Sequence, residues 1–413
     1  MQTKLADFIK DTADGKEAES ILRACVHCGF CTATCPTYQL LGDELDGPRG
    51  RIYLIKQVLE GAEPTRKTQL HLDRCLTCRN CETTCPSGVK YGRLVDIGRR
   101  VVEERVPRPL ADRIKRTTLK EFLPRTALFK PAFRAGQLAR PVLSKALQDK
   151  LQPARHAGAW PTRTHARKML VLEGCVQPAM APGINAATAR VLDAFGVQLI
   201  VAPKAGCCGA VRYHLNDQAA GLIDARRNID AWWPWVERGE IEAIVMTASG
   251  CGVTVKEYGH LLAHDEAYAA KAGRIAMLTR DLSEIMPEFE EQIAARLTGK
   301  IAKRVAYHPP CTLQHGQQIR GKVEGVLRAA GVDVTLCADS HLCCGSAGTY
   351  SVLHPEIAHE LRDRKLANLA ACKPDEIVSA NIGCMTHLQS GTPTPVTHWI
   401  ELLDRALDPG AAP

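Results

Sequence analysis

Two copies of one cysteine spacing constrain this chain more than any other feature. The pattern C-x2-C-x2-C-x3-C-P runs from Cys25 to Pro36 and again from Cys75 to Pro86. Three thiolates placed two residues apart can surround one face of a metal cluster, and the fourth cysteine leaves in another direction. Structural zinc sites instead combine two C-x2–4-C pairs. The triplets with a fourth Cys-Pro therefore favour iron-sulfur clusters over zinc.

This is the spacing of bacterial two-cluster ferredoxins, in which the fourth cysteine of each run binds the other cluster. It predicts two [4Fe-4S] clusters in the first 100 residues. The predicted ligands of cluster 1 are Cys25, Cys28, Cys31 and Cys85, and those of cluster 2 are Cys75, Cys78, Cys81 and Cys35. His27 and Arg79 lie inside the cysteine loops and have the chemistry to tune a cluster, but we expect both to be solvated loop residues.

The region after residue 166 repeats itself. Cys175 and Cys207 are separated by 31 residues, and so are Cys311 and Cys343. In each copy, short β-rich runs alternate with helical patterns of ~10–15 residues, which favours an α/β unit with parallel strands. A duplicated, cysteine-bearing α/β half is the simplest interpretation.

Each copy offers four cysteines for a metal or redox site. The adjacent pairs Cys207-Cys208 and Cys343-Cys344 both precede a glycine. Neighbouring side chains of a strand point to opposite faces, so both thiols of a pair meet one centre only where the backbone turns, which glycine permits. The further predicted iron-sulfur sites are Cys175, Cys207, Cys208 and Cys251 in the first repeat, and Cys311, Cys343, Cys344 and Cys384 in the second. Buried structural cysteines are the alternative interpretation.

Composition places these motifs on an ordinary globular chain. Of 413 residues, 45% are hydrophobic and 24% are charged, which excludes wholesale disorder. No secretory signal is visible and no apolar run approaches the ~20 residues of a membrane span, so we expect the 18 cysteines to lie in a reducing, cytoplasmic compartment. Cys337 and Cys372 fit neither pattern and are predicted to be small core residues.

Positive charge is concentrated between the two cysteine-rich parts. Residues 99–168 hold 18 Lys and Arg against 5 Asp and Glu, whereas the formal charge of the whole chain is +8. Prolines such as Pro124 and Pro131 predict short helices here. A membrane surface, an acidic partner subunit and plain solvent are the three interpretations of this segment. Nucleic acid is not expected, because no binding module is recognised.

These motifs together resemble those of the iron-sulfur subunits of bacterial glycolate oxidase. The resemblance covers nearly the whole chain and includes CVHCGFCTATCPTY, GPRGRIYLIK, GCCGA, YHPPCTLQH, LCCGSAGTYS and NIGCMTH. It implies a complex in which a FAD-containing partner subunit oxidises glycolate to glyoxylate, while this chain passes the electrons toward a quinone or other membrane acceptor. It also implies a cytoplasmic protein associated peripherally with the inner membrane.

The expected fold is multidomain. A mainly helical, ferredoxin-like domain with two [4Fe-4S] clusters precedes a duplicated α/β cysteine-rich domain, called CCG after its cysteine pair and glycine. The predicted boundaries are 1–100 for the ferredoxin-like domain, 101–166 for the basic linker, 167–298 for the first CCG repeat and 299–413 for the second.

Relatives with the same modules leave other functions open. They include electron-transfer subunits of lactate and glycerol-3-phosphate dehydrogenase complexes, and heterodisulfide reductase, a thiol–disulfide reductase. The CCG repeats of the last hold non-cubane clusters through an extra cysteine, and Ala248 and Asn381 stand at those positions here. This departure argues against non-cubane clusters and the reductase reaction, and leaves one ordinary cluster per repeat open. A scaffold whose clusters only hold the fold is the remaining interpretation.

Overall fold

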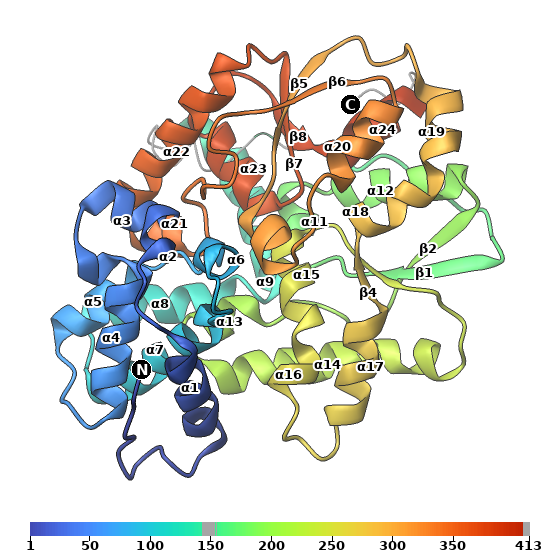
Figure 1. The fold of residues 1–413 in the computed structure, drawn as a ribbon. Coiled ribbons are helices and arrows are strands. Elements are labelled where there is room, and N and C mark those ends of the chain that lie inside the picture. Colours follow the sequence, from blue (N-terminus) through green and yellow to red (C-terminus); the bar gives the residue numbers. More distant parts are fainter. Residues whose placement is uncertain (143–152, 154, 408–413) are drawn as a thin grey trace.

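The computed structural model describes residues 1–142, 153 and 155–407 (Figure 1). The portions of the basic segment and of the second repeat at 143–152, 154 and 408–413 lie outside the described residues. Two parallel β-sheets follow a helical N-terminal part. The predicted combination of a helical module with a duplicated α/β module is confirmed.

Short helices separated by the cysteine loops make up the N-terminal part. They are α1 (Ala13–Ala24), α2 (Phe30–Ala33), α3 (Pro36–Leu41), the 3₁₀ turn η1 (Glu44–Asp46), α4 (Pro48–Leu59), α5 (Arg66–Asp73), α6 (Asn80–Thr84) and α7 (Tyr91–Arg105). Thr12 caps α1 by accepting a hydrogen bond from Gly15 N at 3.0 Å, and a capping box begins α5.

Helices α4 and α7 hold the core of this part. Ile55 and Leu59 of α4 are fully buried in one cluster with Leu94 of α7. A Cβ at Gly98 would lie 2.6 Å from Ile55, so glycine permits the close approach of the two helices. The cysteine loops begin where α1 and α5 end, beside this rigid pair.

The basic segment forms α8 (Leu110–Phe122), α9 (Thr126–Ala139) and the 3₁₀ turn η2 (Arg140–Val142). The expected break occurs at Pro124, between the two helices. It does not occur at Pro131, which lies inside α9. Pro131 and Ala127 are both exposed, so solvent can satisfy the carbonyl that loses its helical hydrogen bond.

Each repeat alternates strands with helices. The first contains β1 (Arg167–Val171), α11 (Gln177–Met180), α12 (Gly183–Ala194), β2 (Val197–Val201), α13 (Ala210–His214), α14 (Gln218–Glu237), β3 (Ile244–Met246), α15 (Ser249–Lys256), α16 (Tyr258–Leu261), α17 (Ala269–Leu278), β4 (Thr279–Asp281), α18 (Leu282–Ile285), the turn η3 (Met286–Phe289) and α19 (Glu290–Leu297). The second contains β5 (Arg304–His308), the π-helical turn η4 (Thr312–Gly316), α20 (Lys322–Ala329), β6 (Asp333–Leu336), α21 (Tyr350–Leu353), α22 (Pro355–Ala371), β7 (Glu376–Ser379), α23 (Ile382–Gln389), β8 (Val396–His398) and α24 (Trp399–Leu407).

Both sheets have four parallel strands in the same order, β2-β1-β3-β4 and β6-β5-β7-β8. Leu170 of β1 lies opposite Ile200 of β2 and Ile244 of β3, and His308 of β5 lies opposite Ser379 of β7. The strand order therefore reverses between β1 and β3, and between β5 and β7. At such switch points the loops beyond the carboxyl ends of the strands diverge and leave room for a ligand.

The two repeats share one hydrophobic core. Val171 on one face of β1 belongs to the same buried cluster as Trp399 of the second repeat, whereas Leu170 faces the opposite cluster. Arg190 of α12 also binds Asp404 of α24 through two contacts of 2.8 and 2.6 Å. The sheets are thus fixed relative to each other.

The helical part packs against the second repeat (Figure 1). Leu76 lies in one buried cluster with Cys311 and Tyr350. The Tyr350 hydroxyl donates a hydrogen bond to the Arg74 carbonyl at 3.0 Å. The second ferredoxin-like cysteine run is therefore held directly against the second CCG repeat.

Candidate iron-sulfur centres

The first predicted set of thiols comes together at one cavity. Cys25, Cys28, Cys31 and Cys85 all line it. His27 and Gly29 have φ values of 58° and 86°, and these left-handed residues turn the chain around the cavity. Burial raises the pKa of Cys25, and it raises that of Cys31 to about 11. A nearby cation such as a metal ion stabilises a buried thiolate.

The thiols of the second set are also close to one another. Cys75, Cys78, Cys81 and Cys35 are electrostatic neighbours, and burial raises the pKa values of Cys78 and Cys81 well above the ordinary range. Thr77 and Arg79 repeat the left-handed turn with φ values of 52° and 58°. The Thr77 amide and the Tyr91 hydroxyl donate hydrogen bonds to Cys75 Sγ at 3.4 and 3.6 Å.

Two buried arginines flank the second set. The Arg51 side chain has 1% exposure and donates to Thr37 Oγ1 at 3.2 Å, beside Cys35 and Cys75. Arg99 donates to the Cys75 carbonyl at 2.6 Å. Positive charge at this place stabilises thiolates and the reduced form of a cluster.

The expectation of a solvated Arg79 is wrong. Its side chain has only 13% exposure and forms a bidentate ion pair with Glu257, at the C-terminus of α15 in the first repeat. The reason is tertiary: the loop that carries Cys78 and Cys81 packs against a part of the chain 178 residues away. His27 is half-buried.

The four thiols of the first repeat meet at the β1–β3 switch point. Cys207 contacts the Cys175 and Cys208 thiols, which lowers the pKa of Cys207, and Cys208 also contacts Cys251. The Gly209 amide donates to Cys207 Sγ at 3.4 Å. Gly209 has a φ of 93°, as the predicted backbone turn requires.

The second repeat reproduces this arrangement at the β5–β7 switch point. Cys311 contacts Cys343, Cys343 contacts Cys344, and Cys344 contacts Cys384. Gly345 has a φ of 87°, and a Cβ there would lie 2.4 Å from the Ala358 carbonyl oxygen. Both pairs of adjacent thiols therefore converge where the chain turns. Cys337 is buried in the hydrophobic core and Cys372 is half-buried against it.

One residue of this site was not singled out by the sequence analysis. His308, at the end of β5, is fully buried and lies with Cys344 and Cys384 such that one ligand atom of each is within 4.8 Å of the others. Its signal is a histidine three residues before Cys311, where the first repeat has Leu172 before Cys175. Comparing the two repeats position by position would have found it.

The second ferredoxin-like set and the second CCG set are neighbours. Cys78 packs against the buried cluster that contains Cys311 and Cys343, and it is an electrostatic neighbour of both. Cys85 and Cys81 line one cavity, so the two ferredoxin-like sets are also adjacent. Three thiol groups therefore form a continuous series from the surface to the second repeat.

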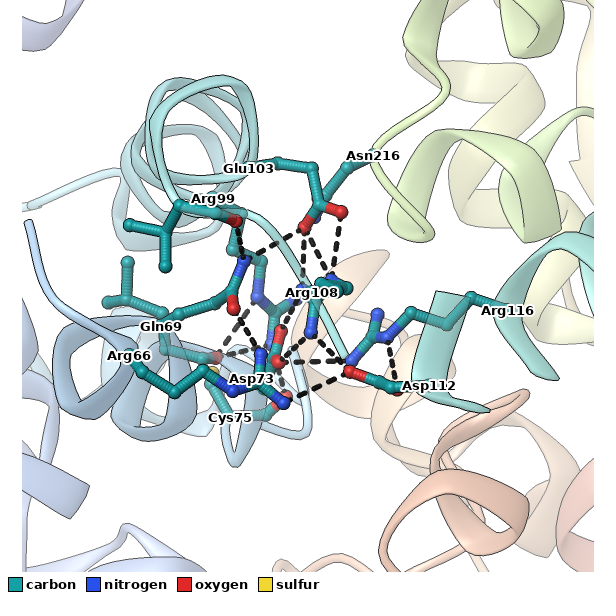
Figure 2. Close-up of polar contacts among 12 residues, drawn as sticks. Arg66, Gln69, Asp73, Cys75, Arg99, Glu103, Arg108, Asp112, Arg116 and Asn216 are labelled. Atoms are coloured by element: carbon teal, nitrogen blue, oxygen red, sulfur yellow. Dashed lines mark hydrogen bonds and ion pairs between the residues drawn. The ribbon is translucent and has the colours of Figure 1, made fainter. Parts of the chain in front are cut away.

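Some arginines of the basic segment form ion pairs with other parts of the protein. Figure 2 shows Arg108 bound to both carboxylate oxygens of Asp73, at 2.6 and 3.0 Å, and also to Glu103 and Asp112. Arg116 binds Asp73 at 3.0 Å. This network fixes α8 on the helix that leads into Cys75. The interpretation of the segment as a solvated linker is therefore wrong for these arginines.

A pocket of about 370 Å³ opens between the helical part and the second repeat. Thr34, Asn80 and Thr84, which precede Cys35, Cys81 and Cys85, line one side. Tyr307 and His315 line the other side. The Tyr307 hydroxyl has no hydrogen-bond partner among the described residues.

Comparisons with known proteins agree with this arrangement. Residues 21–89 match a 4Fe-4S dicluster domain, and residues 169–256 and 305–389 each match a cysteine-rich domain. The chain is 57% identical over 410 residues to the glycolate oxidase iron-sulfur subunit of Escherichia coli, covering 99% of this chain and 100% of that protein. It is 29% identical to the probable glycolate oxidase iron-sulfur subunit of Bacillus subtilis, covering 90% and 89% of the two chains. It is 24% identical to lactate utilization protein A of Geobacillus thermodenitrificans, covering 57% of this chain and 98% of that protein.

Proposed function

This chain belongs to the family of glycolate oxidase iron-sulfur subunits, and from that premise we propose that it carries electrons from a FAD-containing partner subunit to a membrane quinone. The partner oxidises glycolate to glyoxylate in this proposal. The observation that carries it is the continuous series of three thiol groups, which reaches from the cavity around Cys28, near the surface, to the buried Cys311 and Cys343. A chain that only stabilised its own fold would not need adjacent redox sites.

We assign one [4Fe-4S] cluster to Cys25, Cys28, Cys31 and Cys85 and another to Cys75, Cys78, Cys81 and Cys35. Further clusters are assigned to the two CCG sets. The donor sets fit: the four thiols of each set lie near one another, and backbone amides donate to Cys75 Sγ, Cys207 Sγ and Cys343 Sγ. When bound, the clusters supply one-electron redox centres. The protein holds them, excludes water from them and sets their potentials through charge and hydrogen bonds to sulfur.

The quinone head group is proposed to bind in the 370 Å³ pocket. Its lining offers apolar contact from Leu313 and Ile319 and polar groups from Tyr307 and His315. That combination suits a flat ring with two carbonyl oxygens. The pocket is lined by the residues that precede Cys35, Cys81 and Cys85, so the distance for electron transfer from a cluster to the quinone is short.

Peripheral membrane association is proposed for the outer face of α8 and α9. Leu110, Ile114 and Leu128 are 61%, 57% and 51% exposed there, and Arg113 and Lys115 are exposed beside them. Exposed apolar residues interleaved with basic ones bind anionic lipid surfaces. In the described ranges, every helix falls short of the length or apolarity that crossing a membrane would require.

Replacing Cys78 by Ser tests the electron-transfer role. The variant complex should reduce its flavin with glycolate but lose quinone reduction at least tenfold, because the chain of redox centres is interrupted. Cys372→Ser is the matched control, since Cys372 is half-buried outside every set. Full quinone reduction by Cys78→Ser with depleted iron would contradict the proposal. Loss of flavin reduction as well would indicate a structural role instead.

A further inference from the structure

His308 is the most isolated polar side chain near the candidate centres. It is fully buried, and neither Nδ1 nor Nε2 has a hydrogen-bond partner among the described residues. A buried polar group without a partner costs about 1–3 kcal/mol. By contrast, His398 in the same repeat is also buried and bonds the Thr247 carbonyl through Nε2 at 3.0 Å. The position of His308 therefore calls for a partner that is not a protein atom.

The neighbours of the imidazole are thiols. One ligand atom each of His308, Cys344 and Cys384 lies within 4.8 Å of the other two, which is the spacing of donors around a metal centre. The strand register fixes the ring at this place: His308 is opposite Ser379, and the Ser379 hydroxyl donates to its carbonyl at 2.9 Å. A neutral imidazole keeps one ring nitrogen with a free lone pair, which is the form that binds metal.

The first repeat has no counterpart of this donor. Leu172 stands at the equivalent strand end before Cys175 and is buried in the apolar core. Asn381 replaces the extra cysteine of five-thiol repeats, but its amide donates to Cys384 Sγ at 3.7 Å and its oxygen accepts from Gly250. Asn381 is therefore occupied, and His308 is the fifth donor of the second repeat alone.

We propose that His308 is a nitrogen ligand of the iron-sulfur cluster in the second CCG repeat. The inference rests on the proposed function, which places a cluster there. One ring nitrogen donates its lone pair to iron and the other keeps its proton, so no electron or proton is transferred when the bond forms. Compared with a thiolate at the same position, neutral nitrogen carries one negative charge less and gives the higher reduction potential.

Pulsed EPR of the anaerobic complex tests the bond directly. The protein is produced with ¹⁵N-histidine and with unlabelled histidine, and spectra are recorded in the paramagnetic state of each cluster. We expect a strongly coupled nitrogen that changes from ¹⁴N to ¹⁵N with the label. The coupling should be lost in His308→Leu, which copies the first repeat, and retained in His398→Gln. Its absence in the wild type, its persistence in His308→Leu, or only the weak coupling of an N–H···S hydrogen bond overturns the proposal.

His308→Cys separates ligation from folding. Thiolate can replace imidazole on iron, so this variant should keep the wild-type iron and acid-labile sulfide content, lose the nitrogen coupling and shift one cluster to lower potential. Ligation would be refuted if His308→Cys and a folded His308→Gln both lost iron and the wild type showed no nitrogen coupling. Zinc in place of iron at the second-repeat site of the purified complex would refute it as well. If that repeat holds no iron while glycolate still reduces the ferredoxin-like clusters, this inference fails and the proposed function stands.

Discussion

The ion-pair network around Asp73 yields a prediction whose size follows from the structure. Asp73 and Arg108 have side-chain exposures of 7% and 3% and make two contacts of 2.6 and 3.0 Å. Removing one partner of a buried pair costs ~3–5 kcal/mol. Arg108 keeps Glu103 and Asp112, so we expect Asp73→Asn to lower the free energy of unfolding by about 2–3 kcal/mol. In urea this corresponds to a midpoint shift on the order of 1 M.

The assay is anaerobic urea unfolding followed by far-ultraviolet circular dichroism. Asp7→Asn is the matched control: it makes the same substitution in a pair with Lys10 that is open to solvent, and it should leave the midpoint unchanged. A shift for Asp73→Asn no larger than that of Asp7→Asn would refute the reasoning.

The same carboxylate predicts a pH dependence. Burial raises the pKa of Asp73, but the hydrogen bond from Arg108 and the charges of Arg116 and Arg108 outweigh it, and the pKa lies below its ordinary value. A carboxylate whose pKa is lowered by folding stabilises the folded state at pH values above its unfolded-state pKa of ~3.9. This stabilisation is lost as the pH falls through the lower pKa of the folded state. The difference in the free energy of unfolding between wild type and Asp73→Asn should therefore be largest above about pH 5 and decrease below about pH 4. A difference that is constant from pH 3 to pH 7 would contradict this.

Two further predictions concern the cluster sites. Arg51→Gln removes a buried cation beside Cys35 and Cys75, and should lower the potential of that cluster by roughly 50–100 mV in an EPR-monitored titration; an unchanged potential would exclude the electrostatic role. Gly345→Ala places a Cβ 2.4 Å from a carbonyl oxygen and should deplete iron from the second repeat, whereas Gly348→Ala, with open space around its Cβ, should retain it. Equal iron in the two variants would count against the predicted turn.

Local spacing was enough to predict the modules. The two C-x2-C-x2-C-x3-C-P runs and the matched intervals around Cys207 and Cys343 predicted a helical iron-sulfur module and a duplicated α/β module, and both are confirmed. Gly196 and Gly331, which lie between a helix and the following strand β2 or β6, have positive φ values of 82° and 79°. Which cysteines bind each cluster, and the boundaries at 100, 166 and 298, stay predictions.

Long-range contacts were beyond the sequence. Arg79 looks like an exposed loop residue until the pairing with Glu257 brings the first repeat against it. Arg108 and Arg116 read as surface charge because their partners on α5 come 35 and 43 residues earlier. A comparison of the two repeats singles out His308, but its closeness to Cys384 depends on β5 and β7 lying side by side. Each of these features depends on packing between distant segments, which spacing does not encode.

The most direct test of the account is to purify the chain anaerobically with its native partners and add glycolate. D-lactate, L-lactate and glycerol 3-phosphate serve as parallel donors. The account predicts rapid bleaching of the visible iron-sulfur absorbance by glycolate, with EPR signals from at least two reduced clusters and a co-purifying flavoprotein. Intact, partner-bound clusters that glycolate does not reduce would contradict it.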